Sequence, residues 1–211
     1  MPRRPVHKSD LYSFDGIDYR INVRADSGVY ASIMGDLCKH IVCGYSKGRW
    51  SVLHIRYLLG DGATNRLVLD AMRSRLGKMH RYVWTLEESK QDDGDQHYHM
   101  ALFINSREVN MQSIRYLLID LKNRSLIKHY KRIPPDISKS SLELQGELDP
   151  GEIEEVVSRF GLELSNQSAV RYAIYWLSYI AKEKTKVLDG RTFGASKLPD
   201  RWRETATRMP G

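Results

Sequence analysis

Two histidines separated by one residue mark the part of the chain whose side chains could bind a metal ion. His97 and His99 lie in the run 96–104, in which residues that face a core alternate with residues that do not. Residues i and i+2 of a β-strand point to the same face, so the two imidazoles should project side by side. Imidazole nitrogens are common ligands of divalent metal ions. The spacing therefore predicts a pair of histidine ligands for one metal ion.

A second group of reactive side chains recurs at helical spacing in the region 168–186. Tyr172, Tyr175, Tyr179 and Lys182 fall within about 80° of one another on a helical wheel. The aliphatic residues of the same region form a separate face, so packing alone does not account for the tyrosines. The stripe indicates either a surface on which nucleobases stack or a phenol that attacks phosphorus as a nucleophile. The spacing leaves both interpretations open.

The charge of the chain favours a polyanionic partner. Of the 211 residues, 41% are hydrophobic, as in ordinary globular proteins, and the net charge is +7. The stretch 142–160 holds six acidic residues and one basic residue, so the remainder is more basic than the total suggests. The basic charge of this remainder favours a polyanionic partner, of which nucleic acid is the simplest candidate.

The sequence carries no sign of secretion or membrane insertion. No apolar run approaches the roughly 20 residues of a membrane span, and the basic N-terminus lacks the apolar segment of a signal peptide. The two cysteines, Cys38 and Cys43, are expected to be reduced thiols rather than a disulfide framework. We therefore expect a cytoplasmic protein.

Hydrophobic periodicity predicts an α+β fold. Strands and helices are expected in the order strand 50–59, helix 63–78, strand 81–88, strand 96–104, helix 107–122 and strand 126–133. A short polar loop with Asp93 and Gly94 joins the two middle strands, which favours an antiparallel hairpin. This β-α-β-β-α-β order is that of ferredoxin-like folds. We expect an antiparallel sheet with helices on one face and the histidines on the other, open face.

The first 45 residues are expected to form a separate arm and helix. Residues 1–25 show little periodicity and indicate a mobile or loosely docked arm, whereas 26–42 have the spacing of an amphipathic helix. Asp26 or Ser27 could cap this helix, and Gly44 could end it. The chain then divides into residues 1–45 and a main domain over residues 46–211.

The histidine and tyrosine motifs together resemble those of the HUH endonucleases. His97–His99 has the pattern His, bulky hydrophobic residue, His, and Tyr175–Lys182 is similar to the two-tyrosine motif of rolling-circle replication initiators. Filamentous-phage (inovirus-type) initiators also carry a Trp-x-x-Glu strand before the histidines, here Trp84–Glu87. They carry a Phe-Gly-x-Ser-x-Leu-Pro segment after the tyrosines, here Phe193–Pro199. The resemblance covers residues 50–205.

This resemblance implies site-specific nicking and rejoining of single-stranded DNA, dependent on Mg²⁺ or Mn²⁺. His97 and His99 would hold the ion. Tyr179 would be the primary nucleophile, forming a 5′-phosphotyrosine link, and Tyr175 the second. Lys182 would offset the charge of the phosphate or assist the movement of a proton. Tyr172 is expected to stack or pack rather than to react.

The third metal ligand is expected on the strand that precedes the histidines. Glu87 would lie beside them in the hairpin, and Glu88 is the alternative because a slip of one residue exchanges the two faces of a strand. His54 and Arg56 could face DNA, or His54 could be a core histidine. Ser178 stands where the inovirus-type relatives often carry a lysine, which removes a potential phosphate contact there.

The resemblance also implies the partners and the compartment. We expect single-stranded DNA at a replication origin, with a DNA hairpin as a candidate form, and host helicase and polymerase as candidate partners in the cytoplasm of a bacterial host. Relaxases and single-strand transposases of the same superfamily are the alternative enzymes. A non-catalytic DNA-binding repressor on this fold is the third alternative, and the intact histidine pair and tyrosines argue against it.

Overall fold

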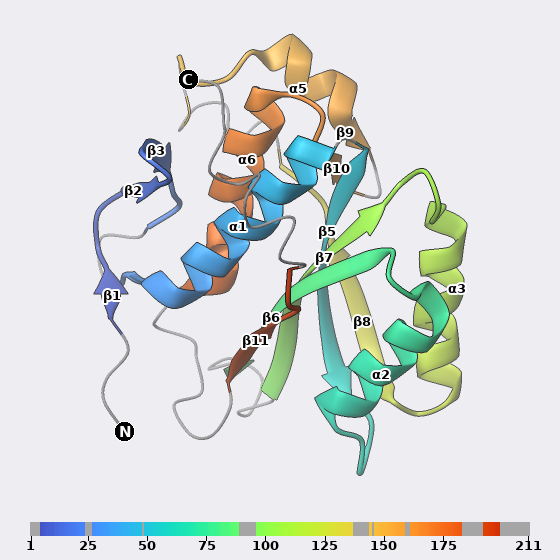
Figure 1. The fold of residues 1–211 in the computed structure, drawn as a ribbon. Coiled ribbons are helices and arrows are strands. Elements are labelled where there is room, and N and C mark those ends of the chain that lie inside the picture. Colours follow the sequence, from blue (N-terminus) through green and yellow to red (C-terminus); the bar gives the residue numbers. More distant parts are fainter. Residues whose placement is uncertain are drawn as a thin grey trace.

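A large antiparallel sheet runs through the protein (Figure 1). The computed structural model describes residues 5–23, 27–47, 49–88, 96–136, 144, 146–158, 161–182 and 192–198. Within these residues seven strands pair in the order β11-β6-β7-β5-β10-β9, and β8 pairs with β5. Their bounds are β5 Trp50–Leu59, β6 His80–Glu88, β7 Gln96–Asn105, β8 Ile127–Ile133, β9 Val157–Ser158, β10 Gly161–Glu163 and β11 Phe193–Ala195.

The predicted order of strands and helices is present. Helix α2 (Asn65–Leu76) connects β5 to β6, and helix α3 (Met111–Asn123) connects β7 to β8. The four strands of this unit lie in the spatial order β8-β5-β7-β6, and every neighbouring pair is antiparallel. The prediction of an α+β protein built on an antiparallel sheet is therefore confirmed. The loop with Asp93 and Gly94 lies outside the described residues.

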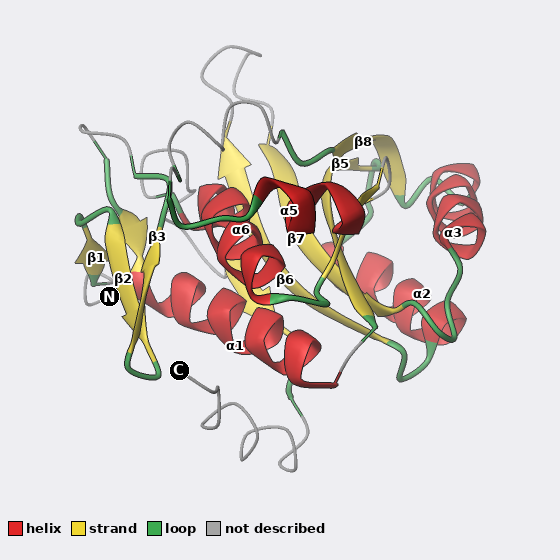
Figure 2. Ribbon diagram, turned by 90° about the horizontal axis from the view of Figure 1, so that it is seen from above, coloured by secondary structure: helices red, strands yellow, loops and turns green. Residues whose placement is uncertain are grey.

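Helices cover both faces of the sheet, so the prediction of one open face is wrong. Figures 1 and 2 show α2 and α3 on one side and α1 (Ala31–Lys47) and α6 (Gln167–Leu177) on the other. The reason is that the strands are apolar on both sides. Val83 and Phe103 are buried toward α1 and α6, and Met100 and Leu102 are buried toward α2 and α3. Both apolar faces need cover. We call the side of α1 and α6 the histidine face, because His97 and His99 point to it.

The N-terminal residues belong to this core and do not form a loosely docked arm. Strand β1 (Val6–His7) pairs with β4 (Val29–Tyr30), and β2 (Leu11–Phe14) forms a hairpin with β3 (Ile17–Arg20). Tyr19 and Ile21 are 2% exposed and lie in the same hydrophobic cluster as the sheet residues Val83 and Phe103. Helix α1 packs against α6 over the histidine face.

The acidic stretch contributes a short helix, α5 (Pro150–Val156). The Asp149 carboxylate accepts hydrogen bonds from the amides of Gly151 and Glu152, which caps the helix. None of the helices in the described ranges is both long and apolar enough to cross a membrane.

Helix α1 does not end at Gly44, contrary to the prediction, but continues to Lys47. It begins at Ala31, while Asp26 lies outside the described residues. Gly44 is buried, and a Cβ atom there would lie 2.7 Å from Leu164 Cδ1 and 3.3 Å from Trp50 Cβ. The glycine is therefore explained by the close approach of the helix to β5 and not by a helix end.

Alanine substitutions at two glycines of α1 test this explanation. At Gly35 the nearest atom to an added Cβ is Tyr12 Oη at 3.5 Å, an ordinary contact. Gly35→Ala should raise the free energy of unfolding by up to about 1 kcal/mol. Gly44→Ala gains the same helix propensity but overpacks the core, so it should be about 1–3 kcal/mol less stable than Gly35→Ala. Urea denaturation measures the difference, and equal stabilities would contradict the packing role of Gly44.

Candidate active site

Strands β6 and β7 bring a carboxylate opposite the histidine pair. In the antiparallel register Glu87 pairs with His97, and Thr85 pairs with His99. Directly paired residues point to the same face of a sheet. Glu88 pairs with Gln96 and is exposed. The structure thus brings Glu87, and not Glu88, to the two histidines.

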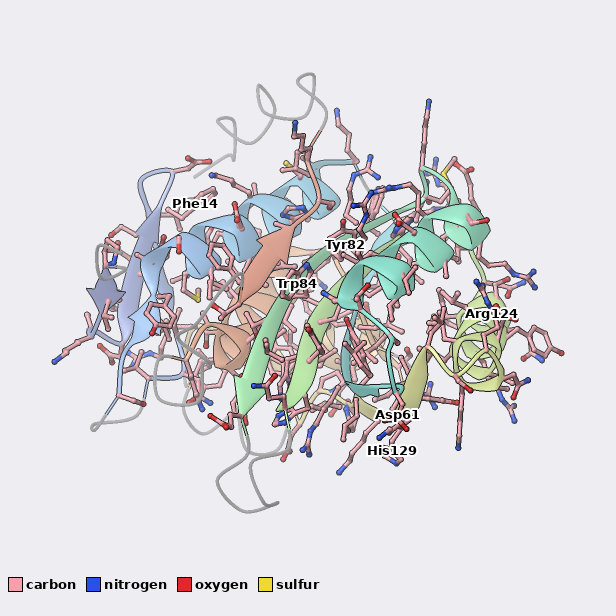
Figure 3. The ribbon with its side chains drawn as sticks, turned by 90° about the horizontal axis from the view of Figure 1, so that it is seen from below. Phe14, Asp61, Tyr82, Trp84, Arg124 and His129 are labelled. Carbon is pink, nitrogen blue, oxygen red and sulfur yellow. The ribbon has the colours of Figure 1, made fainter. Side chains whose placement is uncertain are left out.

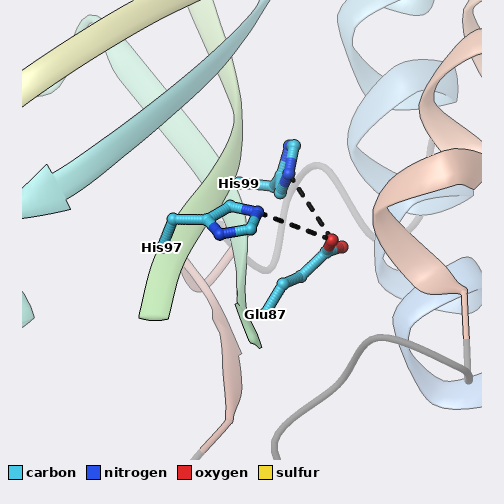
Figure 4. A group of neighbouring side chains, drawn as sticks. All are labelled: Glu87, His97 and His99. Atoms are coloured by element: carbon cyan, nitrogen blue, oxygen red, sulfur yellow. Dashed lines mark ion pairs between the residues drawn. The ribbon is translucent and has the colours of Figure 1, made fainter. Parts of the chain in front are cut away.

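The three side chains form a buried cluster whose ligand atoms converge (Figure 4). Glu87 Oε2 lies 3.5 Å from His99 Nε2 and 3.8 Å from His97 Nε2, and all the ligand atoms lie within 4.8 Å of one another. Ligand atoms bonded at about 2.1 Å to one ion are roughly 3–3.5 Å apart. The exposed fractions are 2% for Glu87, 6% for His97 and 2% for His99. A carboxylate this buried needs compensation, so the residues fit a bound metal ion.

Aromatic side chains support the histidines from the opposite face of the sheet. The ring of Tyr98, between the two histidines in sequence, stacks on Tyr57 of β5 at 5.3 Å and lies 5.6 Å from the ring of Trp84 of β6. Figure 3 labels Trp84 and Tyr82 on β6. Burial raises the pKa of both Tyr57 and Tyr98, so these phenols stay neutral. Contacts among Tyr57, Tyr98 and Trp84 therefore connect the three strands β5, β7 and β6, which carry or flank the metal-ligand candidates.

The segment after the tyrosine region packs against the strand that carries Glu87. Strand β11 pairs with β6, and Gly194 lies opposite Trp84. A Cβ at Gly194 would lie 2.8 Å from the indole nitrogen of Trp84, so only glycine lets the two strands approach without a shift. The Ser196 hydroxyl lies 3.1 Å from both the Tyr82 amide nitrogen and His40 Nε2. The Trp-x-x-Glu and Phe-Gly-x-Ser segments are therefore one structural unit, whereas Pro199 lies outside the described residues.

Tyr179 lies beside the metal cluster. Helix α6 ends at Leu177 and continues as the 3₁₀ helix η1 (Ser178–Ala181), which places the Tyr179 ring 5.5 Å from the ring of His99. The ammonium of Lys182 lies 4.2 Å from the centroid of the Tyr179 ring, within cation–π range. Tyr179 is half-buried and Lys182 is 7% exposed. The structure thus brings together two of the residues predicted to be catalytic.

The predicted tyrosine stripe does not persist along the whole segment. Tyr172 and Tyr175 are 0% and 4% exposed and lie in the hydrophobic core between α6, α1 and the sheet. The packing expected of Tyr172 is confirmed. Because the α-helix changes to a 3₁₀ helix after Leu177, the 100° step that aligned Tyr175 with Tyr179 no longer applies. The described contacts bring Tyr179, and not Tyr175, to the cluster.

Ser178 has a structural role at this change of helix type. Its hydroxyl donates to the Tyr175 carbonyl at 2.6 Å and accepts from the Asn22 amide at 2.9 Å, and the residue is fully buried. A lysine would place a charge in the core at this point. The departure from the resemblance at Ser178 therefore has a physical reason in this chain.

His54 is the site residue that the sequence left unassigned. It lies on β5, on the histidine face, and its Nε2 is 2.8 Å from His99 Nδ1. It is 2% exposed. The period-2 alternation of β5 placed His54 on the same face as Arg56, but it did not indicate a bond to His99.

No protein-family model, curated protein or solved structure matches this chain.

Removing the carboxylate should abolish metal binding. A divalent ion at about 100 times its dissociation constant stabilises a protein by about 2.7 kcal/mol, or roughly 5–10 °C in a chain of this size. We expect such a shift with Mn²⁺ in the wild type and none in Glu87→Gln. Glu88→Gln, one residue away and exposed, is the matched control and should keep the shift. Thermal unfolding with and without Mn²⁺ measures it, and a full shift in Glu87→Gln would rule out this ligand set.

Proposed function

We propose that the protein is a metal-dependent enzyme that nicks and rejoins single-stranded DNA, in the manner of the HUH-type rolling-circle replication initiators that its motifs resemble. The observation that carries this proposal is the position of Tyr179. Its phenol ring lies 5.5 Å from the ring of a metal-ligand candidate, His99. The ammonium of Lys182 lies 4.2 Å from the centroid of the Tyr179 ring. A nucleophile, a cation and a metal site in one place are what phosphodiester transesterification needs.

In the proposed reaction, the Tyr179 oxygen attacks the phosphorus of a phosphodiester. One P–O bond forms to the tyrosine, and the P–O bond to the 3′ oxygen breaks. The phenol proton ends on the released 3′-hydroxyl, and the 5′-phosphate stays on the protein. Because one ester replaces another, attack by a free 3′-hydroxyl reverses the step without ATP. A divalent ion such as Mg²⁺ or Mn²⁺ would withdraw negative charge from a phosphate oxygen. Lys182 would offset the remaining charge.

The environment of the site supports an electrostatic role for these residues. Glu87, His97, His99 and Lys182 are each at most 7% exposed. Water screens charges less in such a setting, so a cation near a phosphate is worth more than at the surface. We assign the first cleavage to Tyr179. Tyr175 could take the second cleavage only after the α6–η1 junction rotates, because its side chain packs in the core.

A row of cations across the sheet supports a nucleic-acid substrate. In the β5–β7 register Arg56 lies opposite His99, and in the β5–β8 register Lys131 lies opposite Arg56. The three side chains therefore share the histidine face. Neighbouring strands are about 4.8 Å apart, so Lys131 is roughly 10 Å from His99 at the level of the backbone. Lys131 is exposed. We propose that these two cations contact phosphates next to the one that is cleaved.

The proposed substrate is single-stranded DNA at a replication origin in a bacterial cytoplasm, with a hairpin origin, host helicase and host polymerase as further parts of the same proposal. Relaxases and single-strand transposases use the same chemistry, so identifying the DNA sequence that is cut would distinguish them from an initiator. A DNA-binding repressor is separated by the absence of a covalent product.

Covalent capture tests the enzyme and its nucleophile. A randomised pool of single-stranded oligonucleotides with a 3′ label is incubated with Mn²⁺, because the proposed link retains the fragment on the 3′ side of the cut. We expect a labelled protein band on a denaturing gel for the wild type. Tyr179→Phe keeps the ring but lacks the nucleophile, so its band should fall at least about 100-fold.

Tyr175→Phe is the control for the covalent assay and should keep the first cleavage. The two substitutions remove the same hydroxyl group, one beside the metal cluster and one in the core. A band that persists in Tyr179→Phe and disappears in Tyr175→Phe would exchange the two roles. No band with any variant would leave a binding protein, and the proposed enzymatic function would be wrong.

Salt dependence tests the row of cations. For single strands, each phosphate contact contributes about −0.7 to the slope of log K against log salt concentration. Arg56→Gln combined with Lys131→Gln should therefore flatten the slope by about 1.4 in fluorescence anisotropy titrations. Arg115→Gln with Lys122→Gln removes the same charge from exposed residues of α3, on the other side of the sheet, and should leave the slope unchanged. Equal slopes for both double variants would place the DNA elsewhere.

A further inference from the structure

His54 is a buried polar residue in the middle of the sheet, next to the metal cluster but not part of it. Its side chain is 2% exposed on β5, and the cluster of converging ligand atoms consists of Glu87, His97 and His99. Buried polar groups in proteins are almost always hydrogen-bonded. The bond that His54 makes to His99, 2.8 Å from Nε2 to Nδ1, therefore needs an explanation in terms of what His99 does.

The bond is compatible with the tautomer of His99 in which Nε2 can bind a metal ion. A hydrogen bond between two imidazoles needs one donor and one acceptor. His99 Nε2 faces Glu87 Oε2 at 3.5 Å and is the nitrogen that converges with the other ligands. For that nitrogen to offer a lone pair, the neutral imidazole must carry its proton on Nδ1. The Nδ1–H group then donates to His54 Nε2, and the ring plane of His99 is set at the same time.

His54 also contacts the segment that carries Tyr179. The ring of His54 lies 5.9 Å from that of Trp176 in an edge-on arrangement and 6.3 Å from that of Tyr179. Since β5 is paired with β7 along its length, the position of His54 is held by the sheet. One side chain therefore lies against both the metal-ligand candidate and the proposed nucleophile.

We propose that His54 is a positioning residue, which holds His99 in its metal-binding tautomer and orientation and seats Tyr179 beside it. The role depends on the hydrogen-bond acceptor at Nε2 and not on a charge on His54. It rests on metal binding by the cluster and is independent of the proposed DNA reaction, so it can be tested on metal binding alone.

Metal affinity of the apoprotein, measured by calorimetric titration with Mn²⁺, tests this role. His54→Leu removes the acceptor and should weaken binding by about 10- to 100-fold, the usual effect of losing the partner of a metal-bound histidine. The amide oxygen of His54→Gln reaches about as far as Nε2, so this variant should keep most of the affinity. His54→Asn is equally polar but too short to reach His99, and it should behave like His54→Leu.

His80 supplies the matched control. It is a buried histidine on strand β6 of the same sheet, 5% exposed, whose Nδ1 lies 2.9 Å from the Gly77 carbonyl oxygen. His80→Gln and His80→Asn remove a buried imidazole from the same sheet and should leave Mn²⁺ affinity unchanged. The visible absorption of the Co²⁺-loaded protein gives a second readout, because it reports ligand geometry. The spectrum should change in His54→Asn and stay the same in His54→Gln and in both His80 variants.

The outcomes separate this inference from the other proposals. Equal Mn²⁺ affinity in the wild type, His54→Gln and His54→Asn would overturn the role of His54 and leave the metal site in place. A wild type that binds neither Mn²⁺ nor Co²⁺ would overturn both. Covalent capture of DNA is measured separately, so a failure there would not change the result for His54. The Gln and Asn variants differ by one methylene, which keeps the comparison valid even where His54→Leu does not fold.

Discussion

The pairing register between β6 and β7 is the constraint on which the candidate site depends. It sets Glu87 opposite His97, with both side chains on the histidine face. A slip of one residue would turn Glu87 away and bring Glu88 forward. The register is held from behind by the stacking of Tyr98 between neighbouring strands, and at the edge by β11, which fits against Trp84 only because a glycine lies opposite. The geometry of the candidate metal cluster thus depends on packing on the opposite face of the sheet.

The cover over the histidine face gives the site its electrostatic character. Helices α1 and α6 cover the sheet there, and the N-terminal strands β3 and β4 pack against these helices. The hydrogen bond that the Asn22 amide donates to the Ser178 hydroxyl joins the tyrosine segment to the N-terminal region. The described residues of the N-terminal region therefore contact the segment that carries Tyr179. A covered site has fewer waters to screen its charges, so electrostatic interactions within it are stronger than at the surface.

The end of helix α6 distinguishes two tyrosines that the sequence treats alike. Tyr175 and Tyr179 are one helical turn apart, yet one lies in the core and the other beside His99. The α-helix ends between them at Leu177. The chain continues as a 3₁₀ helix, in which each residue turns further about the axis than in an α-helix. Lys182, directly after η1, forms an antiparallel β-bridge with Val29, which is a second link between this segment and the N-terminal region.

The sequence by itself determined the local features of this protein. Alternation placed His97 and His99 on one face, and the bounds of β5 and the preference for Glu87 as third ligand followed from the same period of two. Tertiary structure decided the features that depend on residues far apart in the chain: the cover over both faces, the burial of Tyr175, and the bond between His54 and His99, 45 residues apart. A periodic pattern shows which residues share a face, but which distant element covers that face depends on how the helices and strands pack together.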